Sequence, residues 1–200
     1  MHDVQQSGEV LSVDRQIENV LFVCTGNICR SAFAQGLFTK LATEKGLTGV
    51  SADSAGLLAL PDNSATHLAQ RVAAEYGVDL TKHRAKSISK DLVSRSDLIL
   101  VMEKSHETAL LAAFPEATGK VLFLRHFARY GSRRRGVSDP YGLTYDAYRF
   151  CFLDLYEEDR ERLFYTMVQR GVKRLERHLQ AIYEESRRFL AGLTALHVGI

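Results

Sequence analysis

The sequence predicts an α/β fold built on a parallel sheet. Short apolar runs rich in β-branched residues alternate with helical patterns along the 200-residue chain, and such alternation joins parallel strands through helices. The run at 97–102 is almost continuously apolar, as expected of a strand that is buried on both faces. The length fits one domain, which we expect at 18–190 between tails at 1–17 and 191–200.

Four runs are expected to be strands. The first is Asn19–Cys24, and the run at 48–52 is a weaker second. The third is the run at 97–102, and the fourth is at 120–124. Ligands of open parallel sheets bind beyond the carboxyl ends of the strands, and Cys24 occupies that position on the first strand.

Helical patterns lie between and after these runs. The pattern at 30–45 is expected to end at Gly46, and it has four apolar side chains on one face: Phe33, Leu37, Phe38 and Leu41. A second helix is expected to end at Gly77, and another is expected to stop before Pro115. The ranges of the remaining expected helices are 64–76, 89–94, 105–114 and 156–189.

Composition excludes several functional classes. A net charge of +2 is too small to indicate a nucleic-acid partner, no run is long and apolar enough to span a membrane, and residues 1–16 lack the pattern of a signal peptide. Three cysteines do not form a disulfide framework, so we expect a reducing, cytoplasmic location. The basic run at 133–135 is either an ordinary solvated loop or a surface that steers phosphorylated partners.

The loop after the first strand carries the chemistry. An apolar strand runs directly into this loop, and an amphipathic helix pattern follows it; the loop segment reads Cys24-Thr25-Gly26-Asn27-Ile28-Cys29-Arg30-Ser31. Backbone N–H groups at a helix N-terminus bind anions such as phosphate and favour a thiolate over a thiol. The segment therefore indicates both a ligand, phosphate, and a nucleophile, Cys24.

Each neighbour of Cys24 has a task in such a loop. Gly26 lets the chain turn, and Asn27 tolerates left-handed backbone. Arg30 offers a planar fork matched to two phosphate oxygens, and the Ser31 hydroxyl can donate to the sulfur of Cys24. A bare Cys-x5-Arg spacing would leave a structural cysteine as the simpler interpretation, but the full string after a strand is far more specific.

This segment resembles the phosphate loop of low-molecular-weight protein tyrosine phosphatases of the bacterial type. Other segments resemble that family in the same order: Asp53-Ser54-Ala55-Gly56 as a turn after the second strand, Asp79-Leu80 with His83-Arg84-Ala85, the run at 97–102, and Asp139-Pro140-Tyr141. The resemblance covers residues 18–142 well and the last helix loosely. It implies a single three-layer domain with a four-stranded, twisted parallel sheet flanked by helices.

The resemblance also implies roles for individual residues. Asp139 is expected to protonate the leaving phenol, whose pKa is about 10, and then to activate water as a base. Ser54 and His83 are expected to join a hydrogen-bond network under the loop, and Leu60 and Tyr141 to line the substrate cleft. The other residues expected to bind phosphate or support the loop are Thr25, Gly26, Asn27, Ile28, Cys29 and Ser31.

Further expectations concern two residue pairs that the resemblance implies and two positions where the sequence differs from the family pattern. Lys86 and Glu103 match positions that form an ion pair in relatives, and Cys29 matches a cysteine that forms a reversible disulfide with the nucleophile under peroxide. Leu60 stands where many tyrosine phosphatases have a bulky aromatic residue. The segment at 141–161 is longer than usual for the family and rich in aromatic residues; it is either an extra helical turn packed on the core, a lid or docking surface, or a set of phosphorylation sites.

Four functions remain to be weighed at this point. The first is hydrolysis of protein phosphotyrosine in two steps through a phosphocysteine, with no metal or cofactor. An arsenate reductase would need two more cysteines near 90–105, where the chain has none, and a phosphoarginine phosphatase is associated with threonine where Ile28 stands. A module that binds phosphotyrosine without cleaving it is the fourth. The expected partners are phosphotyrosine proteins, such as an autophosphorylating tyrosine kinase or a host protein; the sequence gives no oligomeric state.

Overall fold

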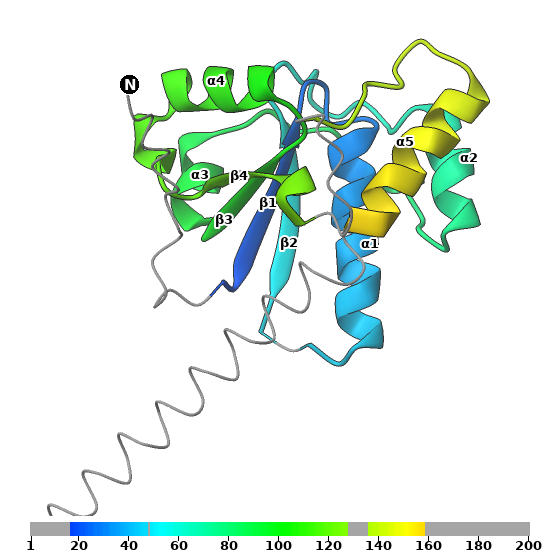
Figure 1. Ribbon diagram of the computed structural model, residues 1–200, viewed down its shortest axis with the longest axis horizontal. Helices are drawn as coiled ribbons and strands as arrows, with labels where there is room; N and C mark the ends of the chain where they lie inside the picture. Colours follow the sequence, from blue (N-terminus) through cyan, green and yellow to red (C-terminus); the bar gives the residue numbers. More distant parts are fainter. Residues whose placement is uncertain (1–16, 48, 128–135, 159–200) are drawn as a thin grey trace, which may run out of the picture.

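The computed structural model describes residues 17–47, 49–127 and 136–158. It contains a sheet of four parallel strands in the order β2-β1-β3-β4 (Figure 1). The strands are β1 (Asn19–Cys24), β2 (Ser51–Gly56), β3 (Leu98–Val101) and β4 (Val121–Phe123). The predicted fold class is confirmed, and the central place of β1 leaves its carboxyl end with a neighbouring strand on each side.

Helices cover both faces of the sheet. Helices α1 (Arg30–Glu44), α2 (His67–Glu75) and α5 (Tyr145–Glu158) lie on one side, and α3 (Lys90–Arg95) and α4 (Lys104–Ala113) lie on the other (Figure 1). Two short 3-10 turns, Pro115–Ala117 and Leu124–Phe127, flank β4.

The strand β1 divides its side chains between the two layers because successive residues of a strand point to opposite faces. Val20, Phe22 and Cys24 belong to the apolar core under α1, α2 and α5. Leu21 and Val23 belong to the core under α3 and α4. All five are almost fully buried, which explains why this strand reads as a continuous apolar run.

Glycines end two helices as predicted. Gly46 has a φ of 63° and Gly77 a φ of 69°, backbone that favours glycine. After α1, the N–H of Leu47 donates to the carbonyl of Ala42 at 2.9 Å, the bond that closes a Schellman motif. Side-chain caps start α2 and α3, because Thr66 and Ser89 accept bonds from backbone N–H groups in the first turn.

The second strand was predicted wrongly in its bounds. The expected range was 48–52, whereas β2 spans Ser51–Gly56, so the segment predicted as a turn after this strand forms its last four residues. These four residues were not predicted as strand because Asp53 and Ser54 are polar and interrupt the apolar pattern. Ser54 is fully buried, but its hydroxyl has partners, accepting from Asn27 at 2.9 Å and donating to Gln35 at 2.6 Å.

The long segment after Pro140 packs on the core where the structure describes it. Helix α5 begins at Tyr145, and its Phe152 stacks on Phe33 of α1 with ring centroids 4.0 Å apart. The segment was expected to add one helical turn packed on the core, and it instead forms a helix of 14 residues that does pack there. Three predicted features lie outside the described residues: the two tails, the basic run at 133–135, and the part of the predicted helix 156–189 beyond Glu158.

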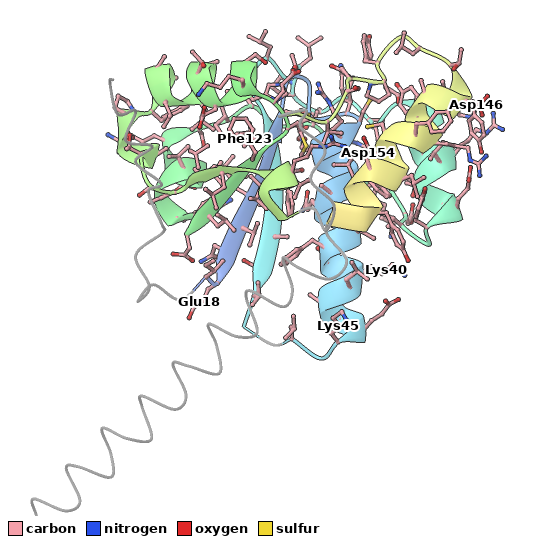
Figure 2. All side chains as sticks on the ribbon, viewed as in Figure 1. Glu18, Lys40, Lys45, Phe123, Asp146 and Asp154 are labelled. Atoms are coloured by element: carbon pink, nitrogen blue, oxygen red, sulfur yellow. The ribbon has the colours of Figure 1, made fainter. Side chains whose placement is uncertain are left out.

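The amino end of α1 faces the carboxyl ends of the strands. Lys40 and Lys45, labelled in Figure 2, lie at the far end of this helix, whereas Asp146 marks the start of α5. In the part of the chain that the structure describes, no helix is both long and apolar enough to span a membrane.

Candidate active site

The site is built on the loop between β1 and α1. Cys24 is the last residue of β1 and Arg30 is the first residue of α1. Both are buried, at 3% and 1% exposure. Asn27 turns the loop with a φ of 55°, the left-handed backbone that its sequence position indicated.

The carbonyl groups of this loop are held by the surrounding scaffold. Four of them accept hydrogen bonds from outside the loop: Cys24 from the N–H of Leu57 (3.0 Å), Thr25 from the N–H of Leu58 (2.9 Å), Asn27 from Nε2 of His83 (2.7 Å) and Ile28 from the N–H of Thr66 (3.0 Å). Burial lowers the pKa of His83, which favours the neutral ring. Because a carbonyl oxygen can only accept, the ring proton lies on Nε2.

This anchoring fixes the direction of the amide groups. In a trans peptide the N–H points opposite to the carbonyl of the preceding residue. The N–H groups of Thr25, Gly26, Ile28 and Cys29 therefore point away from the scaffold. No acceptor for them lies among residues 17–47, 49–127 and 136–158. Successive N–H groups that share a direction form an anion-binding concavity.

The side chain of Asn27 holds the loop from below. Its Nδ2 donates to the hydroxyls of Ser31 and Ser54, each at 2.9 Å, and its Oδ1 accepts from the N–H of Lys86 at 3.0 Å. The Ser31 hydroxyl also lies 2.9 Å from the Cys24 sulfur, and it is the donor whenever that sulfur is a thiolate, which can only accept. The expected network of Asn27, Ser31, Ser54 and His83 is thus assembled, and it ends at the sulfur.

Gly56 allows the loop to lie against the end of β2. A Cβ atom at this position would lie 2.6 Å from the carbonyl oxygen of Thr25 and 2.8 Å from Cβ of Ala59. Such distances are shorter than van der Waals contact, and the first neighbour is backbone. A larger residue would displace the loop that carries Cys24.

Arg30 and Asp139 meet at the mouth of the site. Nη2 of Arg30 lies 2.5 Å from Oδ2 of Asp139, and Nη1 donates to the carbonyl of Val137 at 3.1 Å. The other carboxylate oxygen of Asp139 accepts from the N–H of Tyr141 at 3.1 Å. The structure therefore brings Asp139, 109 residues away in sequence, to the cation of the loop.

A cavity of about 240 Å³ opens above these groups. Cys24, Arg30 and Asp139 all line this cavity. Its rim is apolar, with Leu60 and Tyr141 as expected, at 69% and 63% exposure, and also Leu58 at 77%. Leu58 and Asn63 also line the cavity, which the sequence analysis did not predict. Their closeness in sequence to Leu60, a predicted cleft residue, could have indicated them.

The other two cysteines are poor candidates for the nucleophile. Burial raises the pKa of Cys29 and of Cys151, so both stay protonated. Cys29 lines the cavity, but its sulfur contacts the hydroxyls of Tyr148 and Thr66 at 3.4 and 3.5 Å. All three cysteines are free thiols.

The expected ion pair between Lys86 and Glu103 is wrong. Lys86 pairs with Asp53 at 2.5 Å, whereas Glu103 lies 3.6 Å from Arg30. The sheet order explains the difference. Lys86 lies beside the end of β2 and Glu103 follows β3, so β1 and its loop separate them.

His106 was also missed by the sequence reasoning. This buried residue of α4 contacts the side chain of Thr25 at 2.9 Å. Within the described ranges, no group of three or more His, Cys, Asp or Glu residues is arranged to hold a metal ion.

Comparisons with known proteins agree with this geometry. The model of a family described as "Low molecular weight phosphotyrosine protein phosphatase" matches residues 19–181. The chain is similar to the probable low molecular weight protein-tyrosine-phosphatase EpsP of Ralstonia nicotianae, with 37% identity over 156 residues that cover 78% of this chain and 92% of that protein.

Solved structures give the same result. The chain is similar to the low molecular weight protein tyrosine phosphatase from T. tengcongensis, with a TM-score of 0.68 and 34% identity, covering 74% of this chain and 99% of that one. It is also similar to a cysteine-to-serine mutant of the YwlE arginine phosphatase that carries a phosphorylated active-site serine. That match has a TM-score of 0.66 and 33% identity, and it covers 71% of this chain and 91% of the other.

Proposed function

Because the chain belongs to the low molecular weight phosphotyrosine protein phosphatase family, we propose that it hydrolyses phosphotyrosine in proteins with Cys24 as nucleophile. The observation that carries the proposal is the direction of the loop amides. The residues that carry these amides line the same cavity as Cys24, the guanidinium of Arg30 and the carboxyl group of Asp139.

The first step transfers the phosphoryl group to sulfur. The Cys24 thiolate attacks phosphorus, the S–P bond forms and the bond between phosphorus and the tyrosine oxygen breaks. Arg30 and the loop amides bind the equatorial oxygens, where charge concentrates in the transition state. Asp139 gives its proton to the departing phenoxide.

The second step returns the enzyme to its starting state. Asp139, now a carboxylate, takes a proton from water as that water attacks phosphorus. The S–P bond breaks, and inorganic phosphate leaves. The Ser31 hydroxyl, 2.9 Å from the sulfur, stabilises the thiolate as it departs.

The rim of the cavity supports an aromatic substrate. Leu58, Leu60 and Tyr141 present apolar surface around the opening, which suits a flat ring better than a charged guanidinium. Similarity to the YwlE arginine phosphatase makes phosphoarginine the natural competitor. A phosphotyrosine peptide and a phosphoarginine peptide of one sequence should differ in kcat/KM in favour of phosphotyrosine.

Substitution of Cys24 tests the catalytic proposal. Cys24→Ser should abolish turnover of p-nitrophenyl phosphate, because a serine hydroxyl in this site is a far weaker nucleophile than a thiolate. Cys151→Ala, which removes a buried thiol outside the cavity, is the matched control and should retain activity. Retained turnover in Cys24→Ser would refute the assignment, and absence of turnover in the unmodified protein would favour a module that only binds phosphotyrosine.

We also propose that the site works in a reducing cytoplasm and is protected by Cys29. Peroxide would oxidise the Cys24 thiolate to a sulfenic acid, and attack by Cys29 would release water and form a disulfide. Mass spectrometry after mild peroxide treatment should find Cys24 bonded to Cys29. Sulfonic acid on Cys24 with an unmodified Cys29 would be the contrary result.

The Cys24→Ser variant can also be used to identify the natural substrates. Cys24→Ser keeps the phosphate-binding groups, so it should retain phosphotyrosine proteins from the native cell. We expect an autophosphorylating tyrosine kinase or a host protein among them.

A further inference from the structure

We propose that His106 is a positioning residue that holds the first turn of the phosphate loop against α4 through Thr25. The proposal rests on the proposed phosphatase function and adds a second support for the loop. The Asn27 network holds one side of the loop, whereas His106 reaches it from the opposite layer of the fold.

The geometry of His106 is specific. It is the third residue of α4 and is 3% exposed. Its Nε2 lies 2.9 Å from Oγ1 of Thr25 and 3.2 Å from Oε1 of Glu103. Thr25 directly follows Cys24, and Glu103 lies 3.6 Å from Arg30, so one ring is linked to the neighbours of both the nucleophile and the guanidinium.

The surroundings determine which ring nitrogen carries the proton. Nδ1 of His106 is buried and has no hydrogen-bond partner among the residues that the structure describes. A proton on Nδ1 would leave a buried donor without an acceptor, which is costly. The proton therefore lies on Nε2, which donates to Thr25 with the carboxylate of Glu103 as a second acceptor.

Burial, with a smaller effect from the charge of Arg30, keeps the ring neutral. Burial and the Arg30 guanidinium lower the pKa of His106 to about 4, while Glu103 and Asp139 act in the opposite direction. These are the charged groups around the ring from the loop, from the end of β3 and from the segment after residue 136. A neutral donor can hold Thr25 without adding a second cation beside Arg30.

A pair of substitutions at His106 separates positioning from packing. His106→Leu keeps most of the volume and removes the donor, whereas His106→Gln can place an amide N–H near the position of Nε2. We expect kcat to fall about tenfold in His106→Leu, the loss of one hydrogen bond to a positioned group, and to recover largely in His106→Gln. His67→Leu, at an exposed position in α2, is the control and should leave kcat unchanged.

Two further measurements complete the test: a comparison of substrates with different leaving groups, and a substitution of Thr25, the residue that His106 contacts. Loss of positioning slows attack by sulfur, so the effect of His106→Leu should be similar for phosphotyrosine and for p-nitrophenyl phosphate. Thr25→Val removes the contact from the other side and serves if His106→Leu does not fold. The double variant should be no slower than the slower single variant, because one contact is lost in each case.

Two results would overturn the proposal while leaving the phosphatase function intact. One is an unchanged kcat in His106→Leu or Thr25→Val. The other is equal loss in His106→Leu and His106→Gln with additive effects in the double variant. Lack of turnover in the unmodified protein would instead be a failure of the proposed function, so the two failures are distinguishable.

Discussion

Arg30 is the residue on which the charges of the site converge. Its guanidinium is almost fully buried and contacts the carbonyl of Val137 and the carboxylates of Asp139 and Glu103. A buried cation needs such partners. A phosphate dianion would compete with Asp139 for the same planar fork, so substrate binding would release Asp139 to act as proton carrier.

Asp139 is predicted to matter most for poor leaving groups. Asp139→Ala should lower kcat for a phosphotyrosine peptide by about 10²–10³-fold, the contribution of a general acid. Hydrolysis of p-nitrophenyl phosphate should slow much less, because its phenol leaves readily without a proton. Steady-state kinetics with both substrates make the comparison.

The control for this variant is Asp146→Ala, at an exposed position at the start of α5. It should behave like the unmodified protein with both substrates. If Asp139→Ala slowed both substrates equally, Asp139 would have a binding or structural role instead of proton transfer.

Helix α5 is the element that joins the apolar core to the edge of the site. Phe152 is fully buried and stacks on Phe33 of α1, and Tyr148 contacts Cys29 at the edge of the site. The helix therefore joins the apolar core to the cysteine that is proposed to protect the nucleophile. Phe150, on the other face, is 71% exposed.

These two phenylalanines give a matched test of packing. Phe152→Ala should lower the free energy of unfolding by about 3–5 kcal/mol, as expected for truncation of a buried aromatic residue. Phe150→Ala should change it by less than about 0.5 kcal/mol. Urea unfolding of both variants measures the difference, and equal effects would mean that α5 does not pack on α1 in solution.

At this scale the sequence predicts some elements better than others. The strand β1, its loop and the start of α1 were predicted well, because an apolar run and a specific motif adjoin there. The bounds of β2 were not, because Ser54 is polar yet buried, and only its partners Asn27 and Gln35 make it suited to a strand.

The whole molecule brings distant segments to one edge of the sheet. Because β1 lies between β2 and β3, its loop is contacted from the side of Ser54 and His83 and from the side of His106. The contact of Thr25 with His106 joins residues 81 apart. Spacing along the chain carries no signal for such a contact, and the same topology separates Lys86 from Glu103.

The covalent intermediate is the most direct test of the central claim. The enzyme should be mixed with a phosphotyrosine peptide, stopped within the first turnovers and digested for mass spectrometry under conditions that preserve S-phosphate. We predict a phosphoryl group on Cys24 that disappears as the substrate is exhausted. Turnover at the normal rate with phosphate on no cysteine, or on Cys29 alone, would contradict the account.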